Sequence, residues 1–188
     1  GKLSNEEVNW LSEVGISKSS RVFIMYGQTE ATARISYLDP NLIEKKCGSI
    51  GKAIPGGKLY LKDEKNNLIE KHNSEGELVY KGENVMMGYA ESLSDLSKGY
   101  SIEELKTGDL AYRDLDGFYW ITGRKKRFIK LFGNRYSLDD VENFINNKGF
   151  EVSVIGKDDQ LIIVQEEKQE TDSKNLIKMI SDFYKIHF

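Results

Sequence analysis

The spacing of hydrophobic and polar positions changes along the chain and divides it into two parts. Up to Gly123 most apolar runs are short and are bounded by glycine, asparagine or aspartate, which is typical of strands joined by turns. A helix is predicted at residues 4–14, because Ser4 and Glu7 have the spacing of a capping box. The first part is therefore expected to be β-rich, with one leading helix.

The strands of this first part follow the alternating runs. Single strands are predicted at residues 21–26 and 77–81. Hairpins are predicted at residues 58–69 and 110–122, around the turn sequences Lys-Asn-Asn and Asp-Leu-Asp-Gly.

After Gly123 the pattern becomes mixed. A strand is predicted at 126–132, a turn at Gly133-Asn134, a hairpin at 151–165, and two helices. The first helix begins at Ser137, with Asp140 in its first turn, and the second begins near residue 172. Their expected buried residues are Leu138, Val141, Phe144 and Ile145 in the first and Leu176, Ile177, Ile180 and Tyr184 in the second. The order β-α-β-β-α predicts a small α+β unit that begins near Arg124.

Composition narrows the class of protein. The 188 residues are 39% hydrophobic and 30% charged, which is ordinary for a soluble globular protein. Lysine and arginine number 27 against 30 aspartate and glutamate, a net charge of −3, so nucleic acid is not expected as a partner. No apolar run approaches the roughly 20 residues of a membrane-spanning helix. The single Cys47 fits a reducing compartment, and we expect a cytoplasmic protein.

Five segments carry the most specific signal. They read YGQTE at 26–30, GELVYKG at 76–82, VMMGY at 85–89, KTGDL at 106–110 and GRKKRFIK at 123–130. In that order they resemble the core motifs of the adenylate-forming (AMP-binding) enzymes, which include acyl- and aryl-CoA synthetases, peptide-synthetase adenylation domains and firefly luciferases. Each motif alone is weak, whereas the ordered set, covering residues 1–142, is specific.

The resemblance implies a fold and a domain organisation. Residues 1–123 would be the C-terminal part of the large AMP-binding domain and would include a β-barrel-like subdomain. Residues 124–188 would be most of the small C-terminal domain. The fold class expected is therefore α+β.

The first motif offers several groups to a nucleotide. Tyr26 has a flat face on which adenine can stack, and Gly27 lets the backbone pass close to the ligand. Thr29 has a hydroxyl for a phosphate oxygen, and Glu30 is a hard oxygen ligand suited to Mg²⁺. The resemblance implies these roles. Taken alone, the stretch could equally be a strand that ends in a core tyrosine.

Three later residues could complete the nucleotide site. Asp109 can accept hydrogen bonds from both ribose hydroxyls, Arg124 can reach a ribose or phosphate oxygen, and Ile121 can pack against the nucleoside. The resemblance implies the ribose role for Asp109. The alternatives are a plain turn aspartate, a surface arginine and a core isoleucine.

The basic run after Gly123 matches the hinge of the family. Lys126 holds the hinge position, and a lysine there favours an acyl-CoA-ligase-like enzyme over a peptide-synthetase domain, which carries aspartate. Lys130, with Gly133 and Asn134, matches a hairpin that faces the acyl-adenylate and the pantetheine. A nucleic-acid patch is the alternative for this run, and the acidic chain disfavours it.

Two family motifs do not occur in the sequence. One is the glycine-rich phosphate loop, and the other is the Gly-Lys context of the catalytic lysine that follows the last small-domain helix. We therefore expect a C-terminal fragment, truncated before the catalytic-lysine motif and inactive alone. The intact enzyme would convert a carboxylic acid to acyl-AMP with Mg²⁺-ATP and then to a thioester, with CoA as co-substrate. The alternatives are an enzyme that loads a carrier protein and a noncatalytic nucleotide-binding module.

Overall fold

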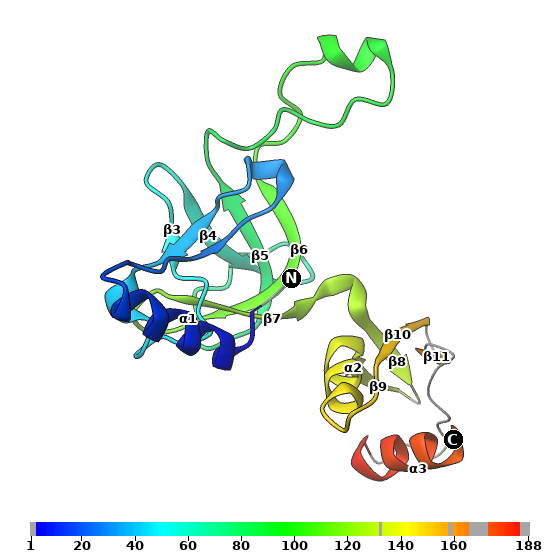
Figure 1. The fold of residues 1–188 in the computed structure, drawn as a ribbon. Coiled ribbons are helices and arrows are strands. Elements are labelled where there is room, and N and C mark those ends of the chain that lie inside the picture. The colour runs from blue at the N-terminus through cyan, green and yellow to red at the C-terminus, as the bar shows by residue number, and fades with distance from the viewer. Residues whose placement is uncertain (1–2, 132, 158–159, 166–172, 185–188) are drawn as a thin grey trace. The chain divides into compact units, whose positions relative to one another are not determined.

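A computed structural model describes residues 3–131, 133–157, 160–165 and 173–184 of the chain. The chain divides into two compact units, Gly1–Lys125 and Lys126–Phe188, and each is described here by itself (Figure 1). Both units contain helices and antiparallel strands, so the expected α+β class is confirmed. None of the helices in the described ranges combines the length and the apolar character needed to span a bilayer.

The first unit begins with helix α1 (Asn5–Ser17). Ser4 Oγ accepts the Glu7 N–H at 3.1 Å, and the Glu7 carboxylate accepts the Ser4 N–H at 2.7 Å. The predicted capping box is therefore confirmed, and the helix continues three residues beyond the predicted end. Val8 is its buried apolar side chain.

Two antiparallel sheets form the body of the first unit (Figure 1). One contains β1 (Ile24–Tyr26), β2 (Ser36–Leu38) and β3 (Lys52–Ala53); the other contains β4 (Lys58–Lys62), β5 (Gly76–Lys81), β6 (Leu105–Arg113) and β7 (Tyr119–Arg124), in that order. The sheets meet at Tyr119, whose carbonyl accepts the Ile50 N–H at 2.9 Å. In the described residues both sheets are open, so the barrel-like subdomain is a pair of joined sheets rather than a closed barrel.

The predicted hairpins differ in how fully they form. The hairpin at 110–122 is present as β6 and β7, which pair from Asp109 with Arg124 to Arg113 with Tyr119, with a register shift between Leu110 and Ala111. The hairpin at 58–69 is shorter than predicted, because Leu68 makes an isolated bridge to Lys62 and not a full strand.

Strand β5 lies at the centre of the unit's core. Leu78, Val79 and Tyr80 are fully buried, because both faces of this strand are covered. Tyr26, at the end of β1, is partly buried and packs against two core clusters, one around Tyr80 and one around Leu78. The last residue of β1 is therefore fixed by packing.

An aromatic and ionic cluster supports the turn between β6 and β7. Tyr112 and Trp120 stack with ring centroids 5.4 Å apart. Lys46 Nζ lies 2.6 Å from carboxylate oxygens of both Asp114 and Asp116, and 5.8 Å from the centre of the Trp120 ring. This cluster attaches the segment that contains Lys46 to the hairpin.

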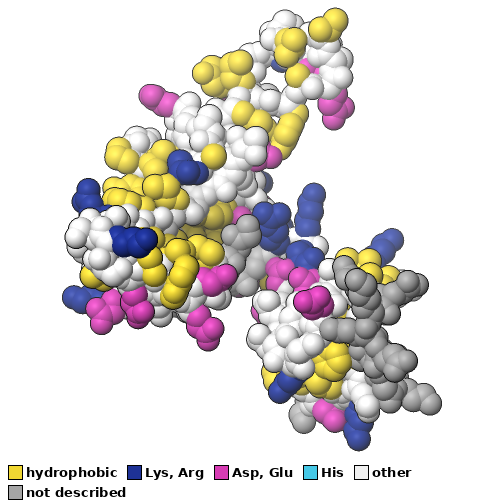
Figure 2. Space-filling model, in the orientation of Figure 1, with side chains coloured by type: hydrophobic (Ala, Val, Ile, Leu, Met, Phe, Trp, Pro, Cys, Tyr) yellow, Lys and Arg dark blue, Asp and Glu magenta, His cyan; other side chains and the backbone are white. Residues whose placement is uncertain are grey.

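The connection between β5 and β6 extends away from the sheets (Figure 1). It contains one short 3-10 helix, Leu93–Ser97. Figure 2 shows exposed hydrophobic side chains along it. The large ones include Tyr89, Leu93, Leu96 and Tyr100.

The second unit contains two hairpins and two helices. Its elements are β8 (Phe128–Leu131), β9 (Asn134–Ser137), α2 (Leu138–Asn146), β10 (Val152–Lys157), β11 (Gln160–Gln165) and α3 (Ser173–Tyr184). Strand β9 was not predicted, so the order is β-β-α-β-β-α rather than β-α-β-β-α. Ser137 caps α2 as predicted, because its Oγ accepts the Asp140 N–H at 3.2 Å.

The core of the second unit lies between the helices and the hairpins. Ile145 and Val154 are fully buried, and Ile180 of α3 is 1% exposed. Ile177 is 48% exposed, so the prediction that it is buried is wrong. At about 100° per residue, Ile177 lies about 100° around the helix axis from Leu176 and about 60° from Ile180, at the edge of the buried face.

Candidate functional site

Tyr26 and Asp109 form the centre of the candidate site. The Tyr26 hydroxyl donates to Asp109 Oδ2 at 2.6 Å, although the two residues are 83 positions apart in the sequence. Tyr26 ends β1 of the first sheet, and Asp109 lies in β6 of the second. The structure therefore brings two of the predicted site residues into direct contact at the place where the two sheets meet.

Arg124 joins this pair from the neighbouring strand. It lies opposite Asp109 in the β6–β7 register, and its Nε is 3.1 Å from Asp109 Oδ1. The Asp109 side chain is 7% exposed, whereas the Arg124 side chain is 69% exposed. The candidate site thus combines a buried carboxylate with an accessible guanidinium.

A bulge in β6 positions Asp109. In the β5–β6 register Glu77 pairs with Leu110 and Val79 with Lys106, which leaves residues 107–109 opposite Leu78. Gly108 has φ +74°, in the left-handed region that glycine adopts without strain. The bulge therefore depends on the glycine of the KTGDL motif.

Thr107 fixes the backbone of this bulge. Its Oγ1 donates to the Leu78 carbonyl at 2.8 Å and accepts the Asp109 N–H at 3.1 Å. A threonine before the Gly-Asp pair thus ties the bulge to β5.

The environment of Tyr26 keeps its hydroxyl protonated. Burial raises the pKa of Tyr26, and the hydrogen bond to the Asp109 carboxylate raises this pKa further. At neutral pH Tyr26 is therefore a donor to the carboxylate, not a phenolate beside it.

The YGQTE motif continues from β1 into a tight loop. The Ile35 N–H donates to the Tyr26 carbonyl at 2.9 Å and closes the loop, which contains one 3-10 turn, Thr29–Ala31. A Cβ on Gly27 would lie 2.6 Å from the carbonyl carbon of Ala33. The loop's own backbone thus requires glycine here, in addition to any approach of a ligand.

Glu30 and Thr29 lie on the 3-10 turn of this loop. The Tyr89 hydroxyl donates to Glu30 Oε1 at 2.6 Å, and the Met86 N–H donates to the Glu30 carbonyl at 2.8 Å. The hydrogen bond from Tyr89, followed by one from Glu30's own backbone N–H, lowers the pKa of Glu30 and favours the carboxylate. Thr29 is exposed. Segment 85–89 thus supports segment 26–30.

Asn84 is a supporting residue that the sequence analysis missed. Its Nδ2 donates to the carbonyls of Ala31, at 2.7 Å, and Arg34, at 2.9 Å, while its Oδ1 accepts the Tyr80 hydroxyl at 2.7 Å. The available signal was an asparagine shortly after a buried strand, because asparagine side chains often satisfy the backbone groups of loops.

Ile121 is a partly buried residue of β7 opposite Ala111. It packs against the cluster of Ile50, Leu61, Leu78, Ala111 and Tyr119, together with Tyr26. Core packing therefore accounts for its position, and contact with a nucleoside stays a prediction.

Lys126 and Lys130, the two predicted site lysines of the basic run, belong to the second unit. Lys126 is exposed in the 3-10 turn Lys125–Arg127, and Lys130 is exposed on β8, opposite Arg135. Gly133 has φ +82°, which suits a glycine between two strands. The hinge role of Lys126 and the ligand role of Lys130 stay predictions.

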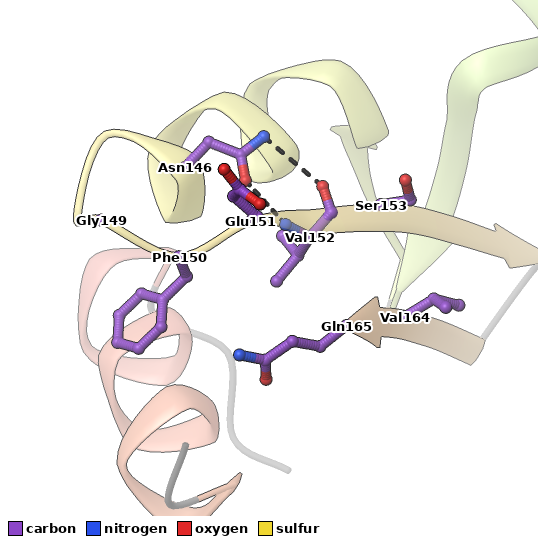
Figure 3. Close-up of a pocket in the computed structure, with 8 residues that line it drawn as sticks. All are labelled: Asn146, Gly149, Phe150, Glu151, Val152, Ser153, Val164 and Gln165. Atoms are coloured by element: carbon purple, nitrogen blue, oxygen red, sulfur yellow. Dashed lines mark hydrogen bonds between the residues drawn. The ribbon is translucent and has the colours of Figure 1, made fainter. Parts of the chain in front are cut away.

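A hollow in the second unit coincides with none of the predicted site residues. Figure 3 shows its lining: Asn146, Gly149, Phe150, Glu151, Val152, Ser153, Val164 and Gln165. The Asn146 side chain accepts the Val152 N–H at 2.9 Å and donates to the Val152 carbonyl at 3.4 Å. The amide of Asn146 is thus used to connect α2 to β10.

Comparisons with known proteins point to one superfamily. Residues 1–90 match the family described as AMP-binding enzyme. The chain is 30% identical over 138 residues to indoleacetate–CoA ligase of Aromatoleum aromaticum, and 32% identical over 153 residues to 2-succinylbenzoate–CoA ligase of Bacillus cytotoxicus. These matches cover 72% and 80% of the chain but 27% and 31% of the two ligases. The chain thus spans about 30% of the length of these curated relatives.

A solved structure agrees with these matches. The o-succinylbenzoate CoA synthetase of Bacillus subtilis, in complex with its acyl-adenylate intermediate, superposes with a TM-score of 0.65 at 25% identity. The superposition covers 92% of this chain and 37% of the synthetase. The same synthetase has been solved with ATP and a magnesium ion. The ordered motifs, the fold and these relatives together show that the chain belongs to the adenylate-forming (AMP-binding) enzyme superfamily.

Proposed function

We propose that the chain supplies the ribose- and base-binding part of an ATP-dependent acid–thiol ligase. The observation that carries the proposal is the contact of Tyr26 and Arg124 with the Asp109 carboxylate, at 2.6 and 3.1 Å. In the proposed reaction a carboxylate oxygen of the acid attacks the α-phosphorus of ATP and displaces pyrophosphate. The thiol of CoA then attacks the acyl carbonyl and displaces AMP.

The three residues have complementary tasks in this proposal. The ring of Tyr26 offers its face to adenine, and the Asp109 carboxylate accepts the ribose hydroxyls. The exposed Arg124 guanidinium donates to a ribose or phosphate oxygen. Ile121 borders the nucleoside from the core side. These tasks are supported by the burial of the carboxylate and the exposure of the guanidinium.

Thr29 and Glu30 would act on the phosphates. The Thr29 hydroxyl donates to a phosphate oxygen, and Glu30 would hold Mg²⁺, which neutralises phosphate charge when bound. A lowered pKa keeps Glu30 ionised, and Tyr89 contacts Oε1, so Oε2 is a suitable ligand. The part of the chain that the structure describes has no cluster of three or more metal-ligating side chains. That fits a Mg²⁺ ion held by one carboxylate together with phosphates.

The acceptor and the domain roles belong to the same proposal. The names of the curated relatives support a carboxylic acid as substrate and CoA as acceptor. Residues 1–123 would end the large domain, and residues 124–188 would form most of the small one. Lys126 would be the hinge, and Lys130 would face the acyl-adenylate. A reducing compartment such as the cytoplasm suits the single Cys47.

The 188-residue chain is proposed not to turn over by itself, because it contains neither the phosphate-loop motif nor a Gly-Lys pair after its last helix. ATP–pyrophosphate exchange across a panel of carboxylic acids should stay at background. Robust exchange would contradict this part of the proposal.

Nucleotide binding is tested separately from turnover. Calorimetry should detect AMP binding to the chain, and Asp109→Asn should weaken it by about tenfold, because charge-assisted hydrogen bonds to the ribose are lost. Asp182→Asn, at an exposed position of α3, is the control and should bind as the wild type does. No binding by the wild type, or identical isotherms for Asp109→Asn, would contradict the nucleotide site.

A further inference from the structure

Side chains already hold the Asp109 carboxylate before any ligand is considered. In the described part of the chain, Oδ2 receives the Tyr26 hydroxyl and Oδ1 receives Arg124 Nε. These donors come from two different sheets, β1 on one side and β7 on the other. Each oxygen is therefore held from a different direction.

The carboxylate can still accept further hydrogen bonds. A carboxylate offers about four lone-pair positions, two on each oxygen. With one position on each oxygen filled, one on each oxygen remains. Two neighbouring acceptor positions match the two hydroxyls of a ribose 2′,3′-diol.

We propose that the Tyr26 hydroxyl is a positioning group that fixes the plane of the Asp109 carboxylate, so that the site distinguishes a nucleotide with an intact ribose diol from its 2′- and 3′-deoxy forms. This inference rests on the proposed function. It gives Tyr26 a second task, carried by its hydroxyl and separate from any stacking of its ring.

The two donors differ in how firmly they can hold the carboxylate. The terminal torsion of an aspartate side chain is broad, so its plane is set by its partners. Arg124 has a 69% exposed side chain and rotates at little cost, whereas Tyr26 is partly buried and packs against two core clusters. The Tyr26 hydroxyl is thus the rigid donor, and its loss leaves the carboxylate plane to a mobile partner.

The test compares ligand changes with a side-chain change. Affinities for AMP, 2′-deoxy-AMP and 3′-deoxy-AMP are measured by NMR titration of the ¹⁵N-labelled chain, for the wild type and for Tyr26→Phe. The wild type should bind each deoxy form about tenfold more weakly than AMP. In Tyr26→Phe, which keeps the aromatic ring, this deoxy penalty should fall to about threefold or less.

Tyr119→Phe is the matched control. Its hydroxyl is also partly buried in the first unit and donates to the Leu59 carbonyl at 2.7 Å. This control loses a comparable hydrogen bond and should keep the full deoxy penalty. A merely structural role for Tyr26 would weaken binding of all three ligands by one common factor, and that result would overturn the proposal.

The remaining outcomes separate this inference from the proposed function. A wild type that binds no AMP overturns both. A wild type that binds AMP, is weakened by Asp109→Asn and shows no deoxy penalty overturns this inference alone. Circular dichroism checks the fold of each variant. If Tyr26→Phe is unfolded, a chain with 4-fluorophenylalanine at position 26, which keeps the ring and fills the hydroxyl position without a donor, replaces it. A deoxy penalty equal to that of the wild type would then overturn the inference.

Discussion

The side-chain amide of Asn84 lies 2.7 Å from the carbonyl oxygen of the fully buried Ala31 and connects the segment after β5 to the loop after β1. The same amide reaches the Arg34 carbonyl, so Asn84 satisfies two backbone groups of a loop that has no long helix or strand of its own.

Asn84→Ala should therefore loosen this loop. The substitution removes the acceptor of the Tyr80 hydroxyl and the side-chain donor to the Ala31 and Arg34 carbonyls, and we expect the free energy of unfolding to fall by about 2–3 kcal/mol. Amide hydrogen exchange should become faster at residues 28–35. The exposed Asn41→Ala serves as the control and should change neither measurement. Unchanged protection of the loop in Asn84→Ala would show that Asn84 does not hold it.

The backbone of the same loop gives a pair of opposite predictions. Gly27→Ala places a methyl group 2.6 Å from the Ala33 carbonyl carbon and should cost about 1–3 kcal/mol of stability. Ala33 has φ +62°, so Ala33→Gly should raise stability by up to about 1 kcal/mol. Urea denaturation followed by circular dichroism measures both. Equal effects of the two changes would contradict the loop geometry.

The contact between Tyr89 and Glu30 predicts a titration shift. The hydrogen bond from Tyr89 is the main cause of the lowered pKa of Glu30, so Tyr89→Phe should move this pKa upward. Because the folded-state pKa is depressed, the stabilisation is complete above the unfolded value of about 4.3 and disappears as the pH falls through the folded value. Carbon-detected NMR of the Glu30 carboxyl between pH 6 and 2 gives the midpoint. Tyr100→Phe, in the same exposed connection, should leave it unchanged.

Two isoleucines of α3 should differ in how much they contribute to the free energy of unfolding. Ile180 is 1% exposed in the core of the second unit, and Ile180→Ala should cost about 2–5 kcal/mol. Ile177 is 48% exposed, and Ile177→Ala should cost less than about 1 kcal/mol. Circular dichroism during urea unfolding compares them. A larger loss for Ile177→Ala would mean that α3 presents another face to the core.

Local sequence signals predicted the elements that local interactions determine. The capping residues Ser4 and Ser137 mark the starts of α1 and α2, because a cap and its N–H partner are three residues apart. The β6–β7 hairpin was likewise indicated by its turn. Strands β2, β3 and β9 were missed, because two to four residues are too few for a periodic pattern, and β9 reads Asn-Arg-Tyr-Ser.

The candidate site was predictable as a set of residues but not as an arrangement. Ordered motifs placed Tyr26 and Asp109 at one proposed nucleoside. The hydrogen bond between them depends on how two sheets meet and on the bulge at Gly108, which no local pattern encodes. Asn84 was missed for the same reason, because its partners Ala31 and Arg34 precede it by about fifty residues.

The stacked Trp120 has a practical consequence for experiments on the chain. Its two tryptophans, Trp10 and Trp120, both belong to the first unit, and tyrosines and phenylalanines are the aromatic residues of the second. Emission excited at the red edge of indole absorption will therefore follow melting of the first unit alone. A change at Ile180 that is confined to the other unit should leave that optical signal unaltered, so a single chain carries a built-in reporter for one of its halves.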